Sequence, residues 1–345
     1  MISQRLSGGR WRRTPCRLRL GWLVVWAIWL GGCAPELSAP PRPGPSAARP
    51  GVWLPVAPRQ LTGVRTWGND LPAAAQPALQ PTPTLKATPA TALCATAGQI
   101  VQGVYPSQIE GPWRNYRIYL PPCYTPARTY PTLYLLHGNV RADEEWDEIG
   151  IDESAESLIH AGRIPPLLIV MPDGRTLSDI TSGGPGSYED SLLSELIPFI
   201  EQTYCAAPQR AYRALGGLSR GGYWALEIAF RHPDQFISVG GHEAALLDIA
   251  TWPEVDPEVT VLTHDLSGLR IYLDFAGGYS MRYTAQGLHE TMLSADIPHV
   301  WLVHPDGQHE EAYWMAHAAE YLLWYAEAWP DGVTGNAPCH LAAEK

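Results

Sequence analysis

The chain has 345 residues, a formal net charge of −11 and a hydrophobic content of 46%. That length and apolar content predict a globular protein with a sizeable buried core. An acidic protein is a poor partner for nucleic acid or for an anionic membrane surface, so neither is expected to be its ligand.

The first 32 residues have the layout of an export signal. Residues 1–19 hold six arginines and no acid, and the apolar run 20–30 follows them but is short for a bilayer span. The run ends in Leu30-Gly31-Gly32-Cys33, which resembles a bacterial lipobox. We therefore expect cleavage before Cys33, lipidation of that cysteine and a cell-envelope protein held to the membrane by its anchor. A plain signal peptide or an uncleaved anchor stays open, and each would still export the domain.

The composition changes twice beyond the signal. Residues 33–92 are rich in Pro, Ala and Thr and predict a disordered tether, because they cannot bury enough apolar surface to offset the entropy of ordering. Residues 93–335 form the predicted catalytic domain, and residues 336–345 form a tail. Four further cysteines favour the disulfides Cys94 to Cys123 and Cys205 to Cys339, with buried free thiols as the alternative.

The predicted domain alternates strand-like and helix-like segments, which indicates an α/β fold with a mostly parallel sheet and helices on both faces. Two segments, 99–105 and 114–120, predict an antiparallel pair that leads into the sheet. Further strands are expected at 132–136, 167–171, 212–215, 237–240, 269–275 and 299–304. Helices are expected at 152–160 with Asp152 as N-cap, at 190–204 with a kink at Pro198, and at 221–231, 285–294 and 312–329.

One pentapeptide, Gly217-Leu218-Ser219-Arg220-Gly221, lies where a predicted strand turns directly into a helix. Glycines on either side of a serine permit a tight turn that exposes the hydroxyl, and this context favours Ser219 as a nucleophile. The NH of Arg220, at the helix start, is a natural donor to an oxyanion. A second donor is expected from the strand-ending loop at Gly138 or Asn139.

A base is expected downstream of the nucleophile. His309 follows the last predicted strand and precedes the last helix, which places it on a loop at the edge of the sheet where Ser219 emerges. The other histidines of this region, His299, His304 and His317, fall within or at the end of a strand or within a helix, where packed or solvated histidines are ordinary.

With these residues in order, the chain resembles the esterase D group of α/β-hydrolases, which includes S-formylglutathione hydrolases, feruloyl esterases, enterochelin esterases and mycolyltransferases. The resemblance spans about residues 99–329. It implies an α/β-hydrolase fold and serine-dependent ester hydrolysis or acyl transfer with Ser219 and His309, without metal or cofactor. It rests on five blocks in family order: 130–138, 169–174, 216–223, 271–274 and 309–314.

The acid of the triad departs from the family pattern. It usually stands in the loop after the strand that ends here near Asp274, but the following residues, 276–280, contain no carboxylate. Glu243, which follows the preceding strand, is placed first as the acid, Asp274 second, and outright loss of the acid third.

We therefore expect an exported serine esterase that works through an acyl-enzyme on a small-molecule or carbohydrate-linked ester. An acyltransferase and a degenerate hydrolase that serves as a surface binding module are the alternatives. Three aromatic residues are candidates to line the substrate pocket, although aromatics of this kind are more often core: Trp146, Tyr188 and Trp224.

Overall fold

Eight strands form one sheet in the computed structural model, which describes residues 96–109, 111–180, 183–246, 252–279 and 282–330. Their order across the sheet is β1-β2-β4-β3-β5-β6-β7-β8. The strands are β1 (Gln99–Pro106), β2 (Trp113–Leu120), β3 (Thr132–Leu136), β4 (Leu168–Pro172), β5 (Arg213–Leu218), β6 (Ser238–His242), β7 (Arg270–Ala276) and β8 (Val300–His304).

The sheet is antiparallel at one side and parallel over the rest. β1 pairs antiparallel with β2, and β2 pairs antiparallel with β4. From β4 to β8 every neighbouring pair is parallel. The α/β fold class and the antiparallel entry predicted from the sequence are therefore confirmed.

Strand composition follows position in the sheet. β3, β4, β5 and β6 are buried along their whole length, as expected for parallel strands covered on both faces. The edge strands β1 and β8 keep partly exposed residues. Because parallel strands all end at one edge, the residues that follow β3, β5, β6 and β8 are brought close together.

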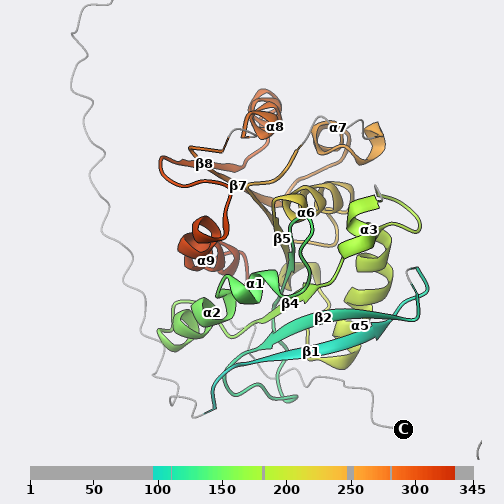
Figure 1. The fold of residues 1–345 in the computed structure, drawn as a ribbon, viewed down its shortest axis with the longest axis vertical. Helices are drawn as coiled ribbons and strands as arrows, with labels where there is room; N and C mark the ends of the chain where they lie inside the picture. The colour runs from blue at the N-terminus through green and yellow to red at the C-terminus, as the bar shows by residue number, and fades with distance from the viewer. Residues whose placement is uncertain (1–95, 110, 181–182, 247–251, 280–281, 331–345) are drawn as a thin grey trace, which may run out of the picture. The chain divides into compact units, whose positions relative to one another are not determined.

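Helices cover both faces of the sheet (Figure 1). α2 and α9 lie on one face, whereas α5 and α6 lie on the other. The helices are α1 (Glu145–Glu148), α2 (Ile151–His160), α3 (Arg175–Ile180), α4 (Tyr188–Asp190), α5 (Ile197–Thr203), α6 (Arg220–Arg231), α7 (Pro257–Thr263), α8 (Arg282–Ser294) and α9 (Glu311–Ala326). Three shorter or irregular turns complete them: the π-helix η1 (Ser191–Leu196) and the 3₁₀ helices η2 (Arg210–Tyr212) and η3 (Pro253–Val255).

Two helix details differ from expectation. Asp152 is not an N-cap, because α2 begins after Gly150, which has the left-handed conformation with φ 81°. Pro198 does not kink a continuous α-helix. The chain runs from α4 through the π-helix η1, and Pro198 lies in the first turn of α5, where its missing NH costs least.

The three aromatic residues expected to line a substrate pocket belong to the core instead. Trp146, Tyr188 and Trp224 are 1%, 3% and 0% exposed. Trp146 donates its indole NH to the carbonyl of Leu136, and Trp224 donates to that of Ser178. The prediction of a pocket role for them is wrong, because large aromatic surfaces pack under the sheet edge rather than facing solvent.

The export signal, Cys33, the tether, Cys94, Cys339 and residues 336–345 lie outside the described residues, so their predicted roles and pairings stay predictions. Within the described part of the chain, no helix combines the length and apolar character needed to cross a membrane.

Candidate active site

Ser219 lies at the sharp turn between β5 and α6. Its backbone has φ 53° and ψ −118°, a conformation that residues other than glycine seldom adopt. Such strain costs on the order of 1–3 kcal/mol and persists where the surrounding structure holds it. Here the NH of Ser219 donates to the carbonyl of His242 at 2.9 Å, and its own carbonyl accepts from Tyr223 and Ala245.

The glycines that flank Ser219 are required by close backbone packing. A Cβ atom on Gly217 would lie 2.2 Å from the carbonyl oxygen of Gly221, and one on Gly221 would lie 2.2 Å from that of Leu136. Neither neighbour is a flexible side-chain end, so larger residues would force the turn apart. The Gly-x-Ser-x-Gly pattern is thus a steric requirement of this turn.

His309 meets the serine hydroxyl directly. Its Nε2 lies 2.9 Å from Ser219 Oγ. The ring of Tyr279 stacks on the imidazole, with centroids 4.1 Å apart and an interplanar angle of 15°, and Trp314 contacts it edge-on. Burial raises the pKa of Tyr279 to about 12, so its hydroxyl keeps its proton at neutral pH. The two aromatic rings restrict the tilt of the imidazole from two sides.

Glu243 contacts the other nitrogen of the same ring. Its Oε2 lies 3.1 Å from His309 Nδ1, and neither atom has a further hydrogen-bond partner among the described residues. The other oxygen, Oε1, accepts the backbone NH of Ala276 at 3.0 Å. Glu243 is fully buried and has φ 48°, so a strained turn after β6 aims this carboxylate at the histidine.

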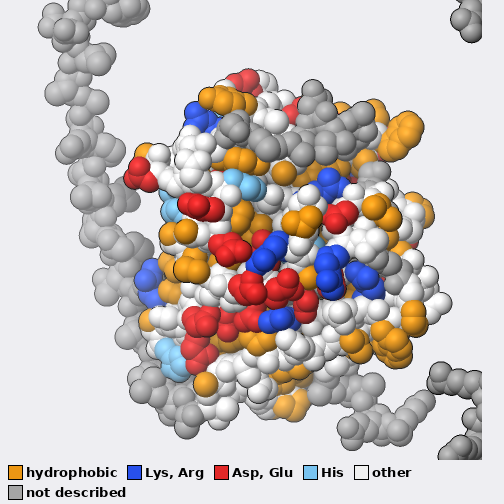
Figure 2. Space-filling view, in the orientation of Figure 1, with side chains coloured by type: hydrophobic (Ala, Val, Ile, Leu, Met, Phe, Trp, Pro, Cys, Tyr) orange, Lys and Arg blue, Asp and Glu red, His pale blue; other side chains and the backbone are white. Residues whose placement is uncertain are grey.

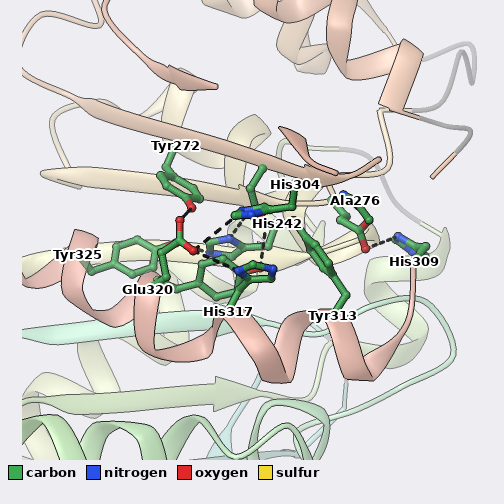
Figure 3. A network of polar contacts seen from close by, with 12 residues as sticks. His242, Tyr272, Ala276, His304, His309, Tyr313, His317, Glu320 and Tyr325 are labelled. Carbon is green, nitrogen blue, oxygen red and sulfur yellow. Dashed lines mark hydrogen bonds and ion pairs between the residues drawn. The ribbon is translucent and has the colours of Figure 1, made fainter. Parts of the chain in front are cut away.

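Asp274 has other partners. Its Oδ1 lies 2.8 Å from Nδ1 of His242, and its Oδ2 accepts the hydroxyls of Tyr313 and Tyr321 at 2.7 and 2.8 Å. His242 also contacts the hydroxyl of Tyr325 through Nε2 at 3.0 Å, which completes a buried network under the site (Figure 3). All three contacts of Asp274 lie within this network, and none is to His309.

The loop after β3 is held by two buried contacts. Glu145 Oε2 accepts the NH of Gly138 at 2.6 Å, and His137 Nε2 accepts the NH of Gly174 at 2.9 Å. The second bond requires the proton of His137 to be on Nδ1, which lies 2.7 Å from the carbonyl of Gly138. Burial lowers the pKa of His137, which favours this neutral ring.

These contacts exclude Gly138, one of the two residues expected to supply the second oxyanion donor. Gly138 cannot supply its NH, because the carboxylate of Glu145 occupies it. Asn139 is exposed, and within the described chain no acceptor engages its NH. Arg220 is the first residue of α6, so its NH has no acceptor within the helix.

A depression of about 450 Å³ lies beside His309 and is lined by Glu145, His309, Glu310, Glu311, Ala312 and Trp314. Acidic and arginine side chains gather on this face of the molecule (Figure 2). Arg141 contacts Glu145, Glu148 and Glu311 there. A larger cavity of about 780 Å³ lies at the amino ends of β7 and β8, whereas the reacting groups lie at the carboxyl ends, so the smaller depression is the better candidate for substrate.

Sequence reasoning missed three contributors to this geometry. Tyr279 stands in the loop where the family acid was sought, and no pattern marks an aromatic ring there as a partner of the base. Glu145 follows Gly138 by seven residues, but only the fold of α1 turns it back toward that loop. The hydrogen bond between His137 and Gly174 joins the loops after two different strands, so it can be predicted only when the order of strands in the sheet is known.

Comparison with known proteins agrees with this fold. Solved structures with the same fold include a ferulic acid esterase (TM-score 0.61, 23% identity, covering 68% of this chain and 98% of that one). They also include an S-formylglutathione hydrolase of Staphylococcus aureus (TM-score 0.58, 18% identity, 67% and 100%). At these identities the likeness shows the fold.

Curated relatives match over shorter stretches. An endo-1,4-beta-xylanase/feruloyl esterase of Xylanibacter ruminicola is 32% identical over 150 residues, which is 40% of this chain and 20% of that protein. An esterase of Mycobacterium tuberculosis is 35% identical over 126 residues, 34% of this chain and 26% of that protein. The chain therefore spans only about a fifth to a quarter of these relatives. The model of the Esterase family matches residues 107–325, and the chain belongs to that family.

Proposed function

We propose that this chain is an exported serine esterase that hydrolyses carboxylic esters through an acyl-enzyme on Ser219. The observation that carries the proposal is the continuous line from Ser219 Oγ to His309 Nε2, at 2.9 Å, and from His309 Nδ1 to Glu243, at 3.1 Å. A nucleophile, a base and a group that orients the base within hydrogen-bond reach are the arrangement that acyl transfer requires.

Acylation begins when His309 Nε2 takes the proton of Ser219 as its Oγ attacks the ester carbonyl carbon. The carbonyl oxygen becomes an oxyanion, which the NH groups of Arg220 and Asn139 stabilise. The protonated imidazole is stabilised by Glu243 and then donates its proton to the departing alkoxide. The products of this half-reaction are the free alcohol and the acyl group on Ser219.

Deacylation repeats the same steps with water. His309 removes a proton from water, the hydroxide attacks the acyl carbonyl, and the proton returns to Ser219 as the carboxylic acid leaves. A sugar alcohol in place of water would make the chain an acyltransferase, but no contact among the described residues favours such an acceptor.

The proposed substrate class is an ester of a small aromatic acid carried by a carbohydrate. The names of the relative from Xylanibacter ruminicola and of the solved ferulic acid esterase support this class. The depression beside His309 is lined partly by Trp314 and is of a size that suits a single small acyl group. Its lining includes Glu145, Glu310 and Glu311, and these acids disfavour an anionic substrate.

The binding-module alternative rests on loss of the acid. The position of Glu243 favours the enzyme over this alternative, because its buried carboxylate lies 3.1 Å from the base, as an active triad requires.

The test is labelling of the full-length protein with a fluorophosphonate probe, together with hydrolysis of p-nitrophenyl acetate and methyl ferulate. We expect labelling and turnover by the wild type, and loss of both in Ser219→Ala. Ser294→Ala, which removes an exposed hydroxyl on α8, is the matched control and should label normally. Absence of labelling in a wild-type protein with a native circular dichroism spectrum would refute the enzyme.

We further propose that Cys33 carries the lipid anchor. Its test is fractionation of cells that express the full chain: Cys33→Ser should move the protein from the membrane to the soluble fraction, whereas Cys16→Ser should not. Membrane attachment of Cys33→Ser would contradict lipidation at that residue.

A further inference from the structure

A second cluster of chemically active side chains lies apart from the triad, between β8 and α9. It consists of His304, the last residue of β8, and of His317 and Glu320 on α9. One ligand atom from each residue lies within 4.8 Å of those of the other two. Glu320 Oε2 is 3.1 Å from His317 Nδ1 and 3.9 Å from His304 Nε2.

The fold brings these groups together through two features. His317 and Glu320 are three residues apart on α9 and therefore share one face of the helix. β8 ends opposite that face, so the ring of His304 lies 3.8 Å from the ring of His317, between centroids. The ring of Tyr313 contacts both imidazoles and closes the side of the cluster that faces the catalytic base.

Surrounding contacts orient the ligand atoms toward a common point. Tyr272 donates its hydroxyl to Glu320 Oε1 at 2.9 Å, which leaves Oε2 directed at the two imidazoles (Figure 3). His304 Nε2 is buried and has no hydrogen-bond partner among the described residues. A buried ring nitrogen without a partner is uncommon in folded proteins and calls for an explanation.

We propose that His304, His317 and Glu320 bind a divalent transition-metal ion of the zinc type. Zinc–ligand bonds of about 2.0–2.1 Å in tetrahedral geometry place ligand atoms about 3.3 Å apart. The distances of 3.1 and 3.9 Å from Glu320 Oε2 to the two imidazoles bracket this value, and all three ligand atoms lie within 4.8 Å of one another. Two imidazoles and one carboxylate suit zinc, whereas calcium and magnesium prefer oxygen ligands throughout. The three residues are partly exposed, so solvent water supplies the fourth ligand.

The ion would connect β8 to α9 at two points that flank His309. His304 precedes the catalytic loop and His317 follows it, so the metal would close a short loop around the base. The ion takes no part in the chemistry of Ser219, and the proposal holds whether or not the chain is an esterase.

The test is zinc binding by the full-length protein after treatment with EDTA and removal of the chelator. We expect isothermal titration calorimetry to report one zinc per chain and zinc to raise the unfolding temperature, because it binds the folded state. Calcium at the same concentration should do neither. His317→Ala and Glu320→Gln should each weaken zinc binding by at least about tenfold, and Tyr272→Phe should weaken it less.

The matched control is His160→Ala. His160 also lies on a helix with a carboxylate nearby, at 3.7 Å from Glu156, but no second imidazole accompanies this pair in the described chain. The His160→Ala variant should bind zinc as the wild type does.

Three outcomes would overturn the proposal. The first is no binding by the wild type at about 100 μM zinc. The second is unchanged binding in a folded Glu320→Gln. The third is loss of binding in His299→Ala with retention in His317→Ala, which would assign the metal to the separate pair of His289 and His299, whose nitrogens are 2.7 Å apart. Each readout is made without an ester, so the result is independent of the proposed reaction.

Discussion

Asp274 lies in β7, two residues before its end, and Glu243 directly follows the neighbouring strand β6, but the two acids have different chemical surroundings. Asp274 contacts His242, Tyr313 and Tyr321 within the buried network, so both of its oxygens already have partners other than His309. Glu243 keeps one oxygen for His309 and fixes the other on the NH of Ala276. A carboxylate with a single free oxygen aimed at the base is suited to orient one tautomer of that base.

Glu243→Gln should therefore lower kcat by a factor on the order of 10³–10⁴ with little loss of stability, because the amide keeps the volume but cannot stabilise the imidazolium. Stopped-flow measurement of acylation with p-nitrophenyl acetate, beside thermal unfolding, checks this.

Asp274→Asn is the matched comparison. It should cost about 3 kcal/mol of unfolding free energy, because an amide NH₂ would face tyrosine hydroxyls in a fully buried network. Its kcat, measured at a temperature where the variant is folded, should fall far less than that of Glu243→Gln. Equal losses of kcat in the two variants would contradict the assignment of the acid.

At this scale the sequence could supply the order of the reacting residues but not their detailed partners. The positions of Ser219, His309 and Glu243 follow from strand ends, which hydrophobic patterns locate well. The occupation of Gly138 by Glu145 and the stacking of Tyr279 on His309 depend on side chains that meet only after distant segments pack. Burial of Trp146, Tyr188 and Trp224 could not be distinguished from a pocket role for the same reason.

Among the elements, the loop between β3 and α1 is held by side chains outside its own sequence. Glu145 on α1 accepts the NH of Gly138, and this contact sets where the next NH, that of Asn139, points. Burial raises the pKa of Glu145, while the Gly138 NH favours its ionised form.

Glu145→Ala should therefore lower kcat by about 10- to 100-fold with a smaller change in KM, because a displaced oxyanion donor acts mainly in the transition state. Glu148→Ala is the control: it removes another acid of α1, which contacts the side chain of Arg141 but not the backbone of Gly138. Steady-state kinetics on methyl ferulate would compare them, and a kcat of Glu145→Ala equal to that of Glu148→Ala would exclude this role.

The strands were predictable because short apolar runs bounded by turn residues are typical of the buried strands of a parallel sheet. The helix around Pro198 was not, since the π-helix η1, which precedes it, has no signature in residue periodicity. Short elements such as α3 and α7 were missed for a related reason, as fewer than two full turns give little periodic signal.

On the scale of the whole molecule, one buried acid on α6 links stability to pH. Glu227 is fully buried, and desolvation together with the nearby Glu189 carboxylate raises its pKa to about 8, although Arg231 lies 2.8 Å away. The folded protein thus keeps this proton to higher pH than the unfolded chain, in which the pKa is near 4.5. The contribution to stability is complete at low pH and is lost as pH rises from about 4.5 through 8.

Glu227→Gln should remove this dependence, because glutamine resembles the protonated acid at every pH. Relative to the wild type, its unfolding temperature should rise between pH 5 and pH 9. Glu290→Gln, which changes an exposed acid of α8, should show a constant difference over the same range. Parallel curves for Glu227→Gln and the wild type would show that Glu227 is ionised throughout.

Because Glu243 directly follows β6, two of the three reacting groups are fixed by the sheet, whereas the third is carried by a loop. Ser219 and Glu243 follow adjacent strands whose backbones are hydrogen-bonded at the turn itself, through the NH of Ser219 and the carbonyl of His242. His309 alone comes from a loop that can open without separating any strand. We therefore expect turnover to fall, through local opening of residues 305–310, at a temperature below the one at which the sheet melts.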